Sequence, residues 1–382
     1  MDFRLSEEHE GFRRAARDLV EREIAPRARE LDASGEMPWA NVRALADLGY
    51  FGINIPEEYG GIGADSVSLA LVVEEIARGC AATALIYEVH CSLCAEVIKR
   101  FGSEQQKRKY LPLLASGKSL GAFALTEPGA GSDAGSAKTS AVADGQRYVL
   151  EGQKCFITSG NVAGVFVVFA MTDKSKGTKG MSAFIVEGGS PGLKAGRVED
   201  KMGLRASPAA EVFFDGCVVP RENLIGAEGD GFKIAMTALD SGRIGVAAQA
   251  TGIAQAALEA AARYSRERVQ FGQPISSFQA IQFMLAEMAT DIEAARLMYR
   301  RAAWMHSQGM RCTKEAAMAK MFASSAAVRA SIKAVQVHGG YGYMREYNVE
   351  RYLRDSKVTE IYEGTNEIMK LVIASQVLKE IA

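Results

Sequence analysis

The chain has 382 residues, a formal net charge of −1, and 48% hydrophobic and 24% charged residues. These values are typical of a soluble globular protein with two or three domains and a large core. The near-neutral charge argues against nucleic acid or an anionic membrane surface as the main partner. Apolar runs such as Val165–Met171 are too short to span a bilayer.

The N-terminus and the cysteines predict a cytoplasmic protein. Residues 1–8 are acidic and show neither a secretory apolar region nor a transit-peptide pattern. Cys91 and Cys94 form an isolated Cys-x-x-Cys in a helix-like run, for which core packing and a redox or metal role both remain open. The six cysteines are scattered, as in a reduced compartment: Cys80, Cys91, Cys94, Cys155, Cys217 and Cys312.

Residues 1–120 are predicted to form an α-helical domain, interrupted by a Pro-Glu-Glu-Tyr-Gly-Gly turn at residues 56–61. One stripe with helical spacing is formed by His9, Phe12, Ala16 and Val20. Further helices are predicted at Ser66–Arg78, Thr83–Arg100 and Gln105–Leu114.

Residues 121–229 predict a small antiparallel β-domain, because short β-type runs alternate there with turn signals such as residues 143–145 and 176–180. The predicted strands are Gly121–Leu125, Tyr148–Leu150, Val165–Ala170, Ala183–Val186 and Glu211–Phe214.

Residues 230–382 are helical again, with Ala-rich segments and few turns, which favours an antiparallel helix bundle. The predicted buried stripe of this bundle consists of Ile281, Leu285, Met288, Ile292, Ala295 and Tyr299.

Two segments of the β-domain are candidate ligand contacts. Residues 126–134 contain Gly129-x-Gly131-x-x-Ala134, but the next segment looks like a strand, which argues against a Rossmann turn. This loop suits a ligand with carbonyls or phosphates, or it is simply a tight turn. Phe156 and Thr158 face the same side of a strand, where they either cover a flat ring and its edge or join the core.

Three segments of the helical bundle are further candidates. Residues 266–275 offer two arginines for a phosphate, or form a solvated helix end. Residues 336–343 contain three glycines, which suggests close packing on a ligand or partner, and His338 reads best as a packed histidine.

The third of these segments, residues 358–368, places Glu363 between two helices, with Thr365 or Asn366 as N-cap. Free N–H groups beside Glu363 would let this segment deprotonate a carbon acid and polarise its carbonyl, whereas a solvated glutamate is the alternative. No pattern predicts a metal site, a nucleophile elbow or a Walker loop.

These segments, in this order, resemble the flavin-dependent acyl-CoA dehydrogenase family over essentially the whole chain. The resemblance implies a mainly α fold with a central β-barrel-like domain and a C-terminal four-helix bundle. It rests on Glu57–Gly61, Leu125–Asp133, Phe156–Thr158, Val219–Gly226, Arg268–Gly272 and Ile361–Glu367.

The resemblance implies FAD as cofactor, bound with its ring system against the β-domain. Many members carry Trp at the position of Phe156, and the flat contact is retained here. The positions that match flavin contacts are Phe123, Leu125, Thr126, Gly131, Ser132, Phe156 and Thr158. Those that match contacts to the FAD of a neighbouring subunit are Arg268, Phe271, Gln336 and Gly340, and those near the adenosine end are Thr365 and Glu367. A complete flavin site then requires a dimer, and the family is usually a homotetramer, a dimer of dimers.

Glu363 matches the catalytic base of most members. Some relatives place that carboxylate on a bundle helix, at the position of Gly242 next to Arg243. The resemblance implies that Glu363 takes the α-proton of an acyl-CoA thioester while flavin N5 accepts the β-hydride, and an apolar pocket should raise the pKa of Glu363. The implied substrate contacts are Ser132, Asp240, Arg243, Tyr362, Glu363 and Gly364.

The resemblance further implies a role in fatty acid or organic acid degradation, with electrons passed to an electron-transferring flavoprotein. An enoyl-CoA reductase running in reverse and a catalytically silent helical binding or assembly protein remain alternatives. The acyl end of the pocket aligns with residues 85–94, where Glu88 and His90 either add polar character or point to solvent or the core. No arginine occurs from Ala81 to Lys99, which argues against a dicarboxylyl thioester.

Overall fold

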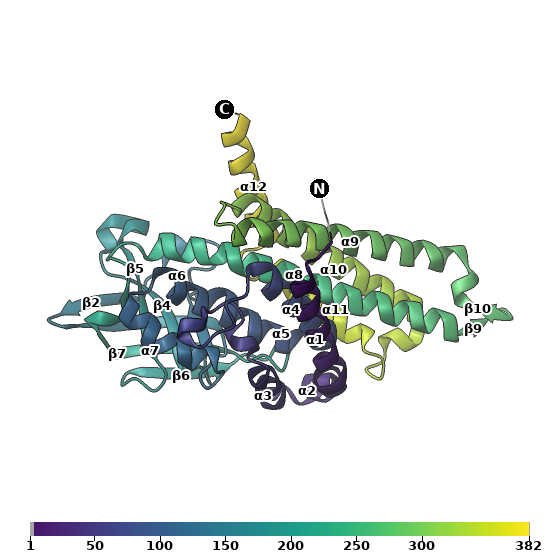
Figure 1. Cartoon of the computed structure of the whole chain (residues 1–382), viewed down its shortest axis with the longest axis horizontal. Coiled ribbons are helices and arrows are strands. Elements are labelled where there is room, and N and C mark those ends of the chain that lie inside the picture. The colour runs from purple at the N-terminus through teal and green to yellow at the C-terminus, as the bar shows by residue number, and fades with distance from the viewer. Residues whose placement is uncertain (1–3, 382) are drawn as a thin grey trace.

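The computed structural model describes residues 4–381 and places a central sheet region between two helical regions along the chain (Figure 1). The long helix α8 (Gly231–Glu267) runs through the middle of the molecule. The sheet lies at one end and a two-stranded hairpin at the other. The predicted fold class, mainly α with a central β-domain, is confirmed.

The N-terminal region begins with α1 (Glu7–Leu19), whose cap Ser6 accepts a hydrogen bond from the His9 N–H. Ala16 and Val20 are buried, as the predicted stripe requires, and His9 and Phe12 are half-buried. The following helices are α2 (Ala28–Ser34), α3 (Trp39–Asp47), α4 (Ser66–Gly79), α5 (Ala81–Glu88), a π-helical segment η5 (Val89–Ala95), α6 (Glu96–Phe101) and α7 (Glu104–Ala115).

Within residues 4–381, one continuous stretch of helix, Ala81–Phe101, has the length and apolar composition needed to cross a bilayer. The expectation that no run is long enough therefore needs correction. Its most apolar 18-residue window is entirely buried inside the fold, as in a core helix, so the stretch is weak evidence for a membrane span.

The sheet pairs its strands in the order β6-β7-β3-β2-β4-β5-β8, with β1 beside β4. Most pairings are antiparallel, but β1 and β2 each run parallel to β4, so the sheet is mixed rather than wholly antiparallel. The strands are β1 (Gly121–Ala124), β2 (Ser140–Asp144), β3 (Arg147–Thr158), β4 (Val165–Met171), β5 (Met181–Glu187), β6 (Leu193–Val198), β7 (Ala209–Pro220) and β8 (Leu224–Ile225).

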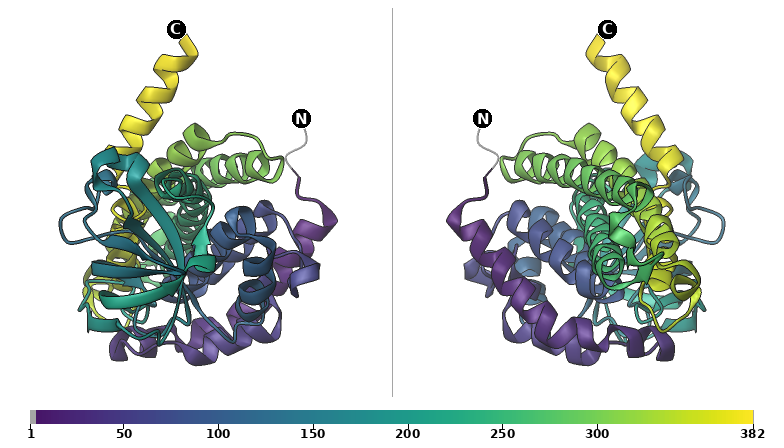
Figure 2. Two further views of the ribbon diagram at one scale, coloured as in Figure 1. Left: turned by 90° about the vertical axis from the view of Figure 1, so that its left-hand side faces the viewer. Right: turned by 90° about the vertical axis from the view of Figure 1, so that its right-hand side faces the viewer.

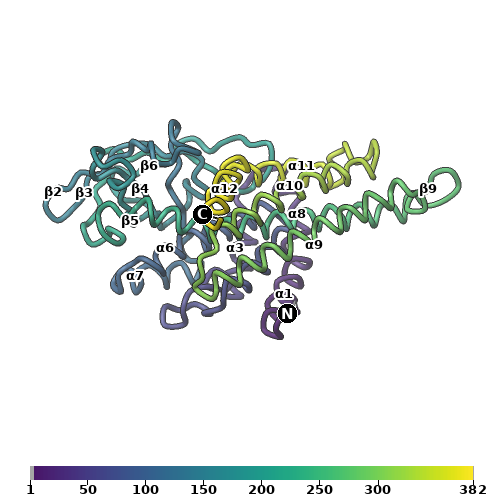
Figure 3. Tube along the Cα trace, turned by 90° about the horizontal axis from the view of Figure 1, so that it is seen from above, coloured from purple at the N-terminus to yellow at the C-terminus, as the bar shows by residue number. Residues whose placement is uncertain are grey.

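The C-terminal helices pack around α8, which contacts α10, α9 and α4. The α8–α9 pair extends beyond the rest of the molecule and carries the hairpin of β9 (Val269–Gln270) and β10 (Gln273–Pro274) at its tip (Figure 3). The helices after α8 are α9 (Gln279–Ser307), α10 (Thr313–His338), α11 (Val349–Lys357) and α12 (Asn366–Ile381).

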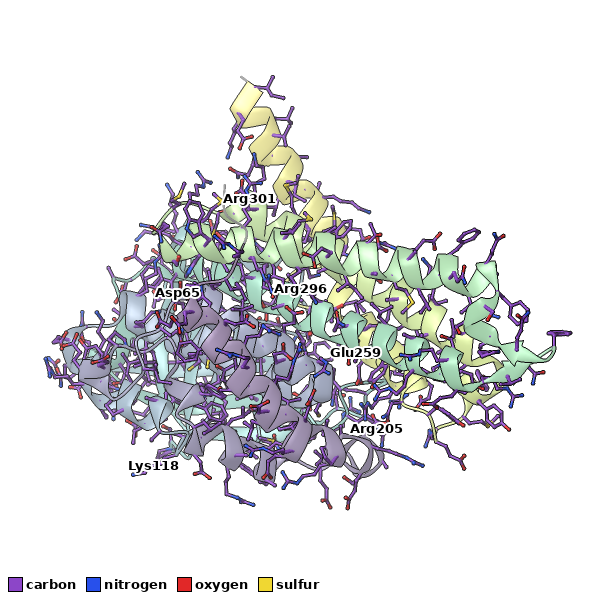
Figure 4. All side chains as sticks on the ribbon, turned by 45° about the vertical axis from the view of Figure 1, so that its right-hand side comes forward. Asp65, Lys118, Arg205, Glu259, Arg296 and Arg301 are labelled. Carbon is purple, nitrogen blue, oxygen red and sulfur yellow. The ribbon has the colours of Figure 1, made fainter. Side chains whose placement is uncertain are left out.

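A buried stripe on α9 and two ion pairs to α4 hold the C-terminal helices against the N-terminal region. In the predicted α9 stripe, Met288, Ile292, Ala295 and Tyr299 are buried, while Ile281 and Leu285 near the extended tip are half-buried. Ion pairs join α9 and α8 to α4, through Arg296 with Glu74 at 2.7 Å and Glu259 with Arg78 at 2.9 Å; Figure 4 labels Glu259 and Arg296. Helix α12 projects away from the body of the chain in both views of Figure 2.

Candidate active site

Glu363 lies in the turn between α11 and α12, as the sequence predicts. Its backbone is in the left-handed region, with φ of 52°, which is costly for a residue with a side chain and directs the carboxyl into the protein. Of the two candidate caps, Thr365 caps α12, because its Oγ1 accepts a hydrogen bond from the Ile368 N–H at 3.3 Å. The side chain of Asn366 is instead buried against α10.

Two buried cations hold the carbonyl groups of this turn. Arg243 of α8 donates to Glu363 O at 3.4 Å, and Lys320 of α10 donates to Gly364 O at 2.7 Å and to Asn366 Oδ1 at 3.1 Å. The N–H groups of Glu363 and Gly364 have no partner within residues 4–381. They are therefore available to a carbonyl oxygen of a bound ligand.

The carboxyl of Glu363 is buried and accepts no hydrogen bond of standard geometry. Burial raises the pKa of Glu363 to about 7, against the opposing effects of Glu88, Arg243 and Lys320. The carboxyl points at α8, where a Cβ atom at position 242 would lie 2.0 Å from Glu363 Oε2. A glycine at position 242 thus leaves the space that this side chain fills.

Glu88, at the end of α5, faces the same space rather than solvent. Its side chain is fully buried, and burial followed by the charge of Glu363 raises its pKa well above the usual range. A Cβ atom at position 245 would lie 2.6 Å from Glu88 Oε1. His90 belongs to the core, where its Nδ1 accepts from the Gly121 N–H at 3.0 Å. The polar character of the pocket therefore comes from Glu88 and not from His90.

Three further predicted substrate contacts lie beside this turn: Asp240, Arg243 and Tyr362. Asp240 forms an ion pair with Arg243 at 3.0 Å, one turn apart on α8. The hydroxyl of Tyr362 donates to Gln249, further along the same helix. Arg243 is nearly buried, and burial lowers its pKa. The α8 face from Asp240 to Gln249 thus lines one side of the candidate site.

The loop after β1 is a tight turn with an open far side. The backbones of Glu127 and Ala130 pair with each other, and no atom lies within 4 Å of where a Cβ of Gly131 would be. Ser132 is exposed beside it. The loop leads through a three-residue 3-10 turn, Ala134–Ser136, into β2 and β3 and not into an α-helix, so the rejection of a Rossmann turn is confirmed.

A buried ion pair supports this loop. Lys154 of β3 is fully buried and lies 2.8 Å from Glu127, and it also donates to Leu125 O at 3.0 Å. Glu127 further accepts from the N–H groups of Lys138 and Thr139 at 2.6 and 3.0 Å. The pair therefore ties the loop to two strands of the sheet.

Phe156 is an aromatic side chain held out of the core. The β3–β7 pairing shifts register between Lys154 and Ile157, Phe156 has φ of 57°, and its side chain is 65% exposed. The strand is thus bulged, not regular, yet Phe156 and the half-buried Thr158 both remain accessible. Phe123 is half-buried against Phe169, with ring centroids 4.9 Å apart, and Leu125 and Thr126 follow it.

The second group of predicted flavin contacts lies at the opposite end of the molecule (Figure 1). A cavity of about 500 Å³ there is lined by Arg268, Gly340, Tyr341 and the packed His338, among others. Phe271, at the hairpin tip, is 93% exposed, and Gln336 is also exposed. The fold does not bring this group to Phe156 within one chain. Thr365 and Glu367 stay near the Glu363 turn.

Backbone strain falls on the predicted site. Within residues 4–381, the non-glycine residues with positive φ are Phe156, Ser159, Leu204, Phe271 and Glu363. Phe156, Phe271 and Glu363 were each predicted as flavin or substrate contacts from the sequence. A non-glycine residue with positive φ costs free energy, and such residues tend to persist at functional sites. The backbone conformation therefore supports the predicted role of these three positions.

Lys320 and Lys154 are buried cations beside the candidate site that the sequence did not predict. Lys320 follows Ala316-Ala317-Met318-Ala319, and a lone lysine in a run of apolar residues was the available signal. Burial lowers the pKa of Lys320 to about 8. Lys154 lies two residues before Phe156, but nothing in the sequence pairs it with Glu127.

The pocket and strand features fit a flavin. An exposed aromatic at a bulge, an open loop with hydroxyl groups, and an arginine-lined cavity are the elements that a planar ring and a pyrophosphate require. Within residues 4–381, no group of three or more His, Cys, Asp or Glu side chains is arranged to hold a metal ion.

Comparison with known families gives matches along most of the chain. Residues 6–118 match the acyl-CoA dehydrogenase N-terminal domain, residues 122–217 the middle domain and residues 229–378 the C-terminal domain. An acyl-CoA dehydrogenase of Bacillus subtilis (strain 168) is 52% identical over 98% of this chain and 99% of its own length. The acryloyl-CoA reductase (NADH) of Anaerotignum propionicum is 50% identical over 99% and 96%.

Solved structures give the same result. A chain from a structure of the electron transferring flavoprotein of Acidaminococcus fermentans superposes with a TM-score of 0.98 at 50% identity, covering 99% of this chain and 100% of that chain. Butyryl-CoA dehydrogenase from Megasphaera elsdenii gives 0.97 at 48% identity, with 99% and 100% covered. The FAD complex of PigA gives 0.95 at 31% identity, with 99% of both chains covered.

Proposed function

The chain belongs to the acyl-CoA dehydrogenase family, and we propose on that premise that Glu363 is the base that removes the α-proton of a short-chain acyl-CoA thioester. The protein is an FAD-dependent oxidoreductase that acts on acyl-CoA. When bound, FAD supplies the acceptor for the hydride that leaves the β-carbon.

One observation carries the assignment of Glu363: its carboxyl is buried without a hydrogen-bond donor, next to N–H groups of the same turn that have no partner. A thioester carbonyl that accepts from the N–H of Glu363 becomes polarised, which acidifies its α-carbon. The carboxylate, with a pKa of about 7, is matched to proton removal near neutral pH.

Arg243 and Lys320 act as positioning residues in this scheme. By holding the carbonyl groups of Glu363 and Gly364, they fix the turn so that its free N–H groups and the carboxyl stay together. Their charges also favour the ionised form of Glu363. Asp240 in turn orients Arg243.

A short acyl group is the favoured substrate. Support comes from the similar butyryl-CoA dehydrogenase structure and from a short-chain-specific relative that is 48% identical. Glu88 adds a second carboxyl to the space in front of Glu363 and so limits the room for a long apolar chain. An electron-transferring flavoprotein as electron acceptor is supported by the similar chain in the Acidaminococcus fermentans structure.

The flavin site is shared between subunits of a homotetramer, in the cytoplasm. Phe156 belongs to the sheet at one end of the chain and Arg268 adjoins the hairpin at the other, so one FAD would need residues of two chains to contact both. Apolar side chains on α12 support an assembly as well, because Leu371 and Leu378 are 66% and 70% exposed on a projecting helix. All six cysteines are free, as a reducing compartment allows.

The test is anaerobic addition of acyl-CoA thioesters to the yellow holoenzyme, with short, long, branched and dicarboxylic members. Bleaching of the flavin band by the short members is expected, and Glu363→Gln should keep FAD and lose the bleaching. A Glu363→Gln variant with near-normal turnover would sink the assignment. Bleaching by long-chain thioesters alone would overturn the substrate class.

Reduction of an enoyl-CoA is a second candidate, because the acryloyl-CoA reductase (NADH) of Anaerotignum propionicum is as similar as the named dehydrogenases. The same base and donors serve both directions, since Glu363 in its protonated form returns the α-proton. Oxidation of the pre-reduced enzyme by acryloyl-CoA, together with absence of bleaching by propionyl-CoA, would identify this direction.

A further inference from the structure

We propose that Glu88 and Glu363 form a proton-sharing carboxyl pair, in which Glu88 keeps the proton and donates it in a hydrogen bond to the Glu363 carboxylate. Glu88 is then a positioning residue that keeps the base ionised and aimed. The inference rests on the proposed role of Glu363, and it gives Glu88 a role in proton removal beyond its place at the acyl end of the pocket.

The backbone brings the two side chains into one compartment. Glu88 is the last residue of α5, and the helix continues as the π-helical segment η5, a geometry that often occurs at functional sites. On the facing helix α8, two glycines one turn apart make room. Cβ atoms at positions 242 and 245 would lie 2.0 Å from Glu363 Oε2 and 2.5 Å from Glu88 Cγ.

Neither carboxyl has another hydrogen-bond donor among the described residues. The four carboxyl oxygens of Glu88 and Glu363 are buried and receive no hydrogen bond from any donor within residues 4–381. Both carboxyl groups face α8 at glycines one turn apart, and the charge of Glu363 raises the pKa of Glu88. One retained proton would satisfy both groups. Four buried oxygens without a donor would otherwise be costly to keep in a folded protein.

The other polar groups around the pair do not replace that proton. The Tyr362 hydroxyl donates to Gln249, and the Ser92 hydroxyl near Glu88 makes no hydrogen bond. Tyr87 and Cys91 flank Glu88 on its own helix, and burial raises the pKa of both, so they stay neutral.

Charge decides which carboxyl keeps the proton. Arg243 of α8 and Lys320 of α10 lower the pKa of Glu363, but neither acts on Glu88. Two carboxylates in contact inside a protein cannot both be ionised, so the one nearer the cations takes the charge. Glu88 is therefore the acid of the pair and Glu363 the base, each suited to one role by its surroundings.

The test compares Glu88→Gln with Glu88→Leu in the holoenzyme. Glutamine still donates an N–H to Glu363, whereas leucine does not. The acidic limb of the kcat/KM profile against pH should stay in place in Glu88→Gln and move up by about one pH unit or more in Glu88→Leu. Cys94→Ala, in the adjoining π-helical segment but bonded to Val165 O, is the matched control and should leave the limb unchanged.

Infrared spectroscopy provides a readout that does not depend on turnover. At a pH above the acidic limb of every variant, where Glu363 is ionised, the wild-type protein should show a C=O band of a buried protonated carboxyl that is sensitive to deuterium exchange, and both Glu88 variants should lose that band. A band that persists in Glu88→Gln, or an unshifted limb in Glu88→Leu, would overturn the pair. If wild type fails to turn over any thioester, the proposed function fails while the infrared result still decides the pair.

Discussion

Glu363 occupies the space that a side chain at position 242 would need, since a Cβ atom there would lie 2.0 Å from Glu363 Oε2 and 2.9 Å from its Cδ. The proposed base position of this chain and the position of the base in some relatives therefore open onto the same point of the pocket. A side chain at position 242 and the inward-pointing carboxyl of Glu363 cannot both occupy this space.

Gly242→Ala should displace the Glu363 carboxyl by the width of a methyl group. Because misplacement by about 1 Å can cost about 100-fold in rate, kcat for a short-chain thioester should fall by about that factor, with FAD retained. Gly11→Ala is the matched control, because nothing lies within 4 Å of its Cβ position. Unchanged kcat in Gly242→Ala would show that Glu363 is not the base.

The pH dependence of kcat/KM should report the pKa of Glu363, about 7. The base acts in its ionised form, so the rate should be low below about pH 6, rise through pH 7 and level off above about pH 8. An α-dideuterated thioester checks that proton removal limits the measured rate. A flat profile from pH 5.5 to 8.5 would contradict the assignment.

Lys320→Met removes the donor to Gly364 O and Asn366 Oδ1. The loss of buried hydrogen bonds to a charged group should cost about 1–3 kcal/mol, visible as a lower Tm. The lost positive charge should also move the acidic limb of kcat/KM to higher pH, since Lys320 lowers the pKa of Glu363.

Lys333→Met is the control for Lys320→Met. Lys333 lies on the same helix, α10, and forms a surface ion pair with Glu287 of α9. It should change neither Tm nor the limb appreciably. A Lys320→Met variant with a lower Tm and an unmoved limb would restrict Lys320 to a structural role.

Lys154→Met should destabilise the β-domain, because it leaves the buried Glu127 carboxylate without its cation. Removal of one partner of a buried ion pair costs about 3–5 kcal/mol, whereas Lys194→Met at the exposed pair with Asp215 should cost less than about 1 kcal/mol. FAD should also dissociate faster from Lys154→Met, since the Thr126–Ser132 loop loses its support. Equal Tm values for the two variants would contradict this role.

Mixed oligomers can test whether two chains share each flavin site. Arg268→Ala and Phe156→Ala homo-oligomers should each retain little FAD. In a mixed pair, one site carries both substitutions and the other carries neither, so purified mixed pairs should recover flavin in about half of their sites and randomly paired co-expressed chains in about a quarter. Mixed oligomers as colourless as the parents would show that both residues serve a site within one chain.

Much of the fold could be predicted from local pattern. The apolar runs of β4 and β5 and the stripe of α9 are buried as expected, because their burial follows directly from residue type and period. Strand β6 was missed, since Leu193–Val198 is mostly exposed and carries lysine, glycine and arginine instead of an alternating apolar pattern. The bulge at Phe156 was missed because register depends on the partner strand.

The sequence by itself determined the family, the helix break that carries Glu363, and the aromatic, hydroxyl and arginine residues that are proposed to contact a flavin. Tertiary structure alone decided that Lys320 is buried, that Lys154 pairs with Glu127, and that Glu88 meets Glu363 across two glycines of α8. The reason is that the charge state of a buried group depends on desolvation and on neighbouring charges. Both arise only when segments distant in sequence pack together, so no local pattern encodes them.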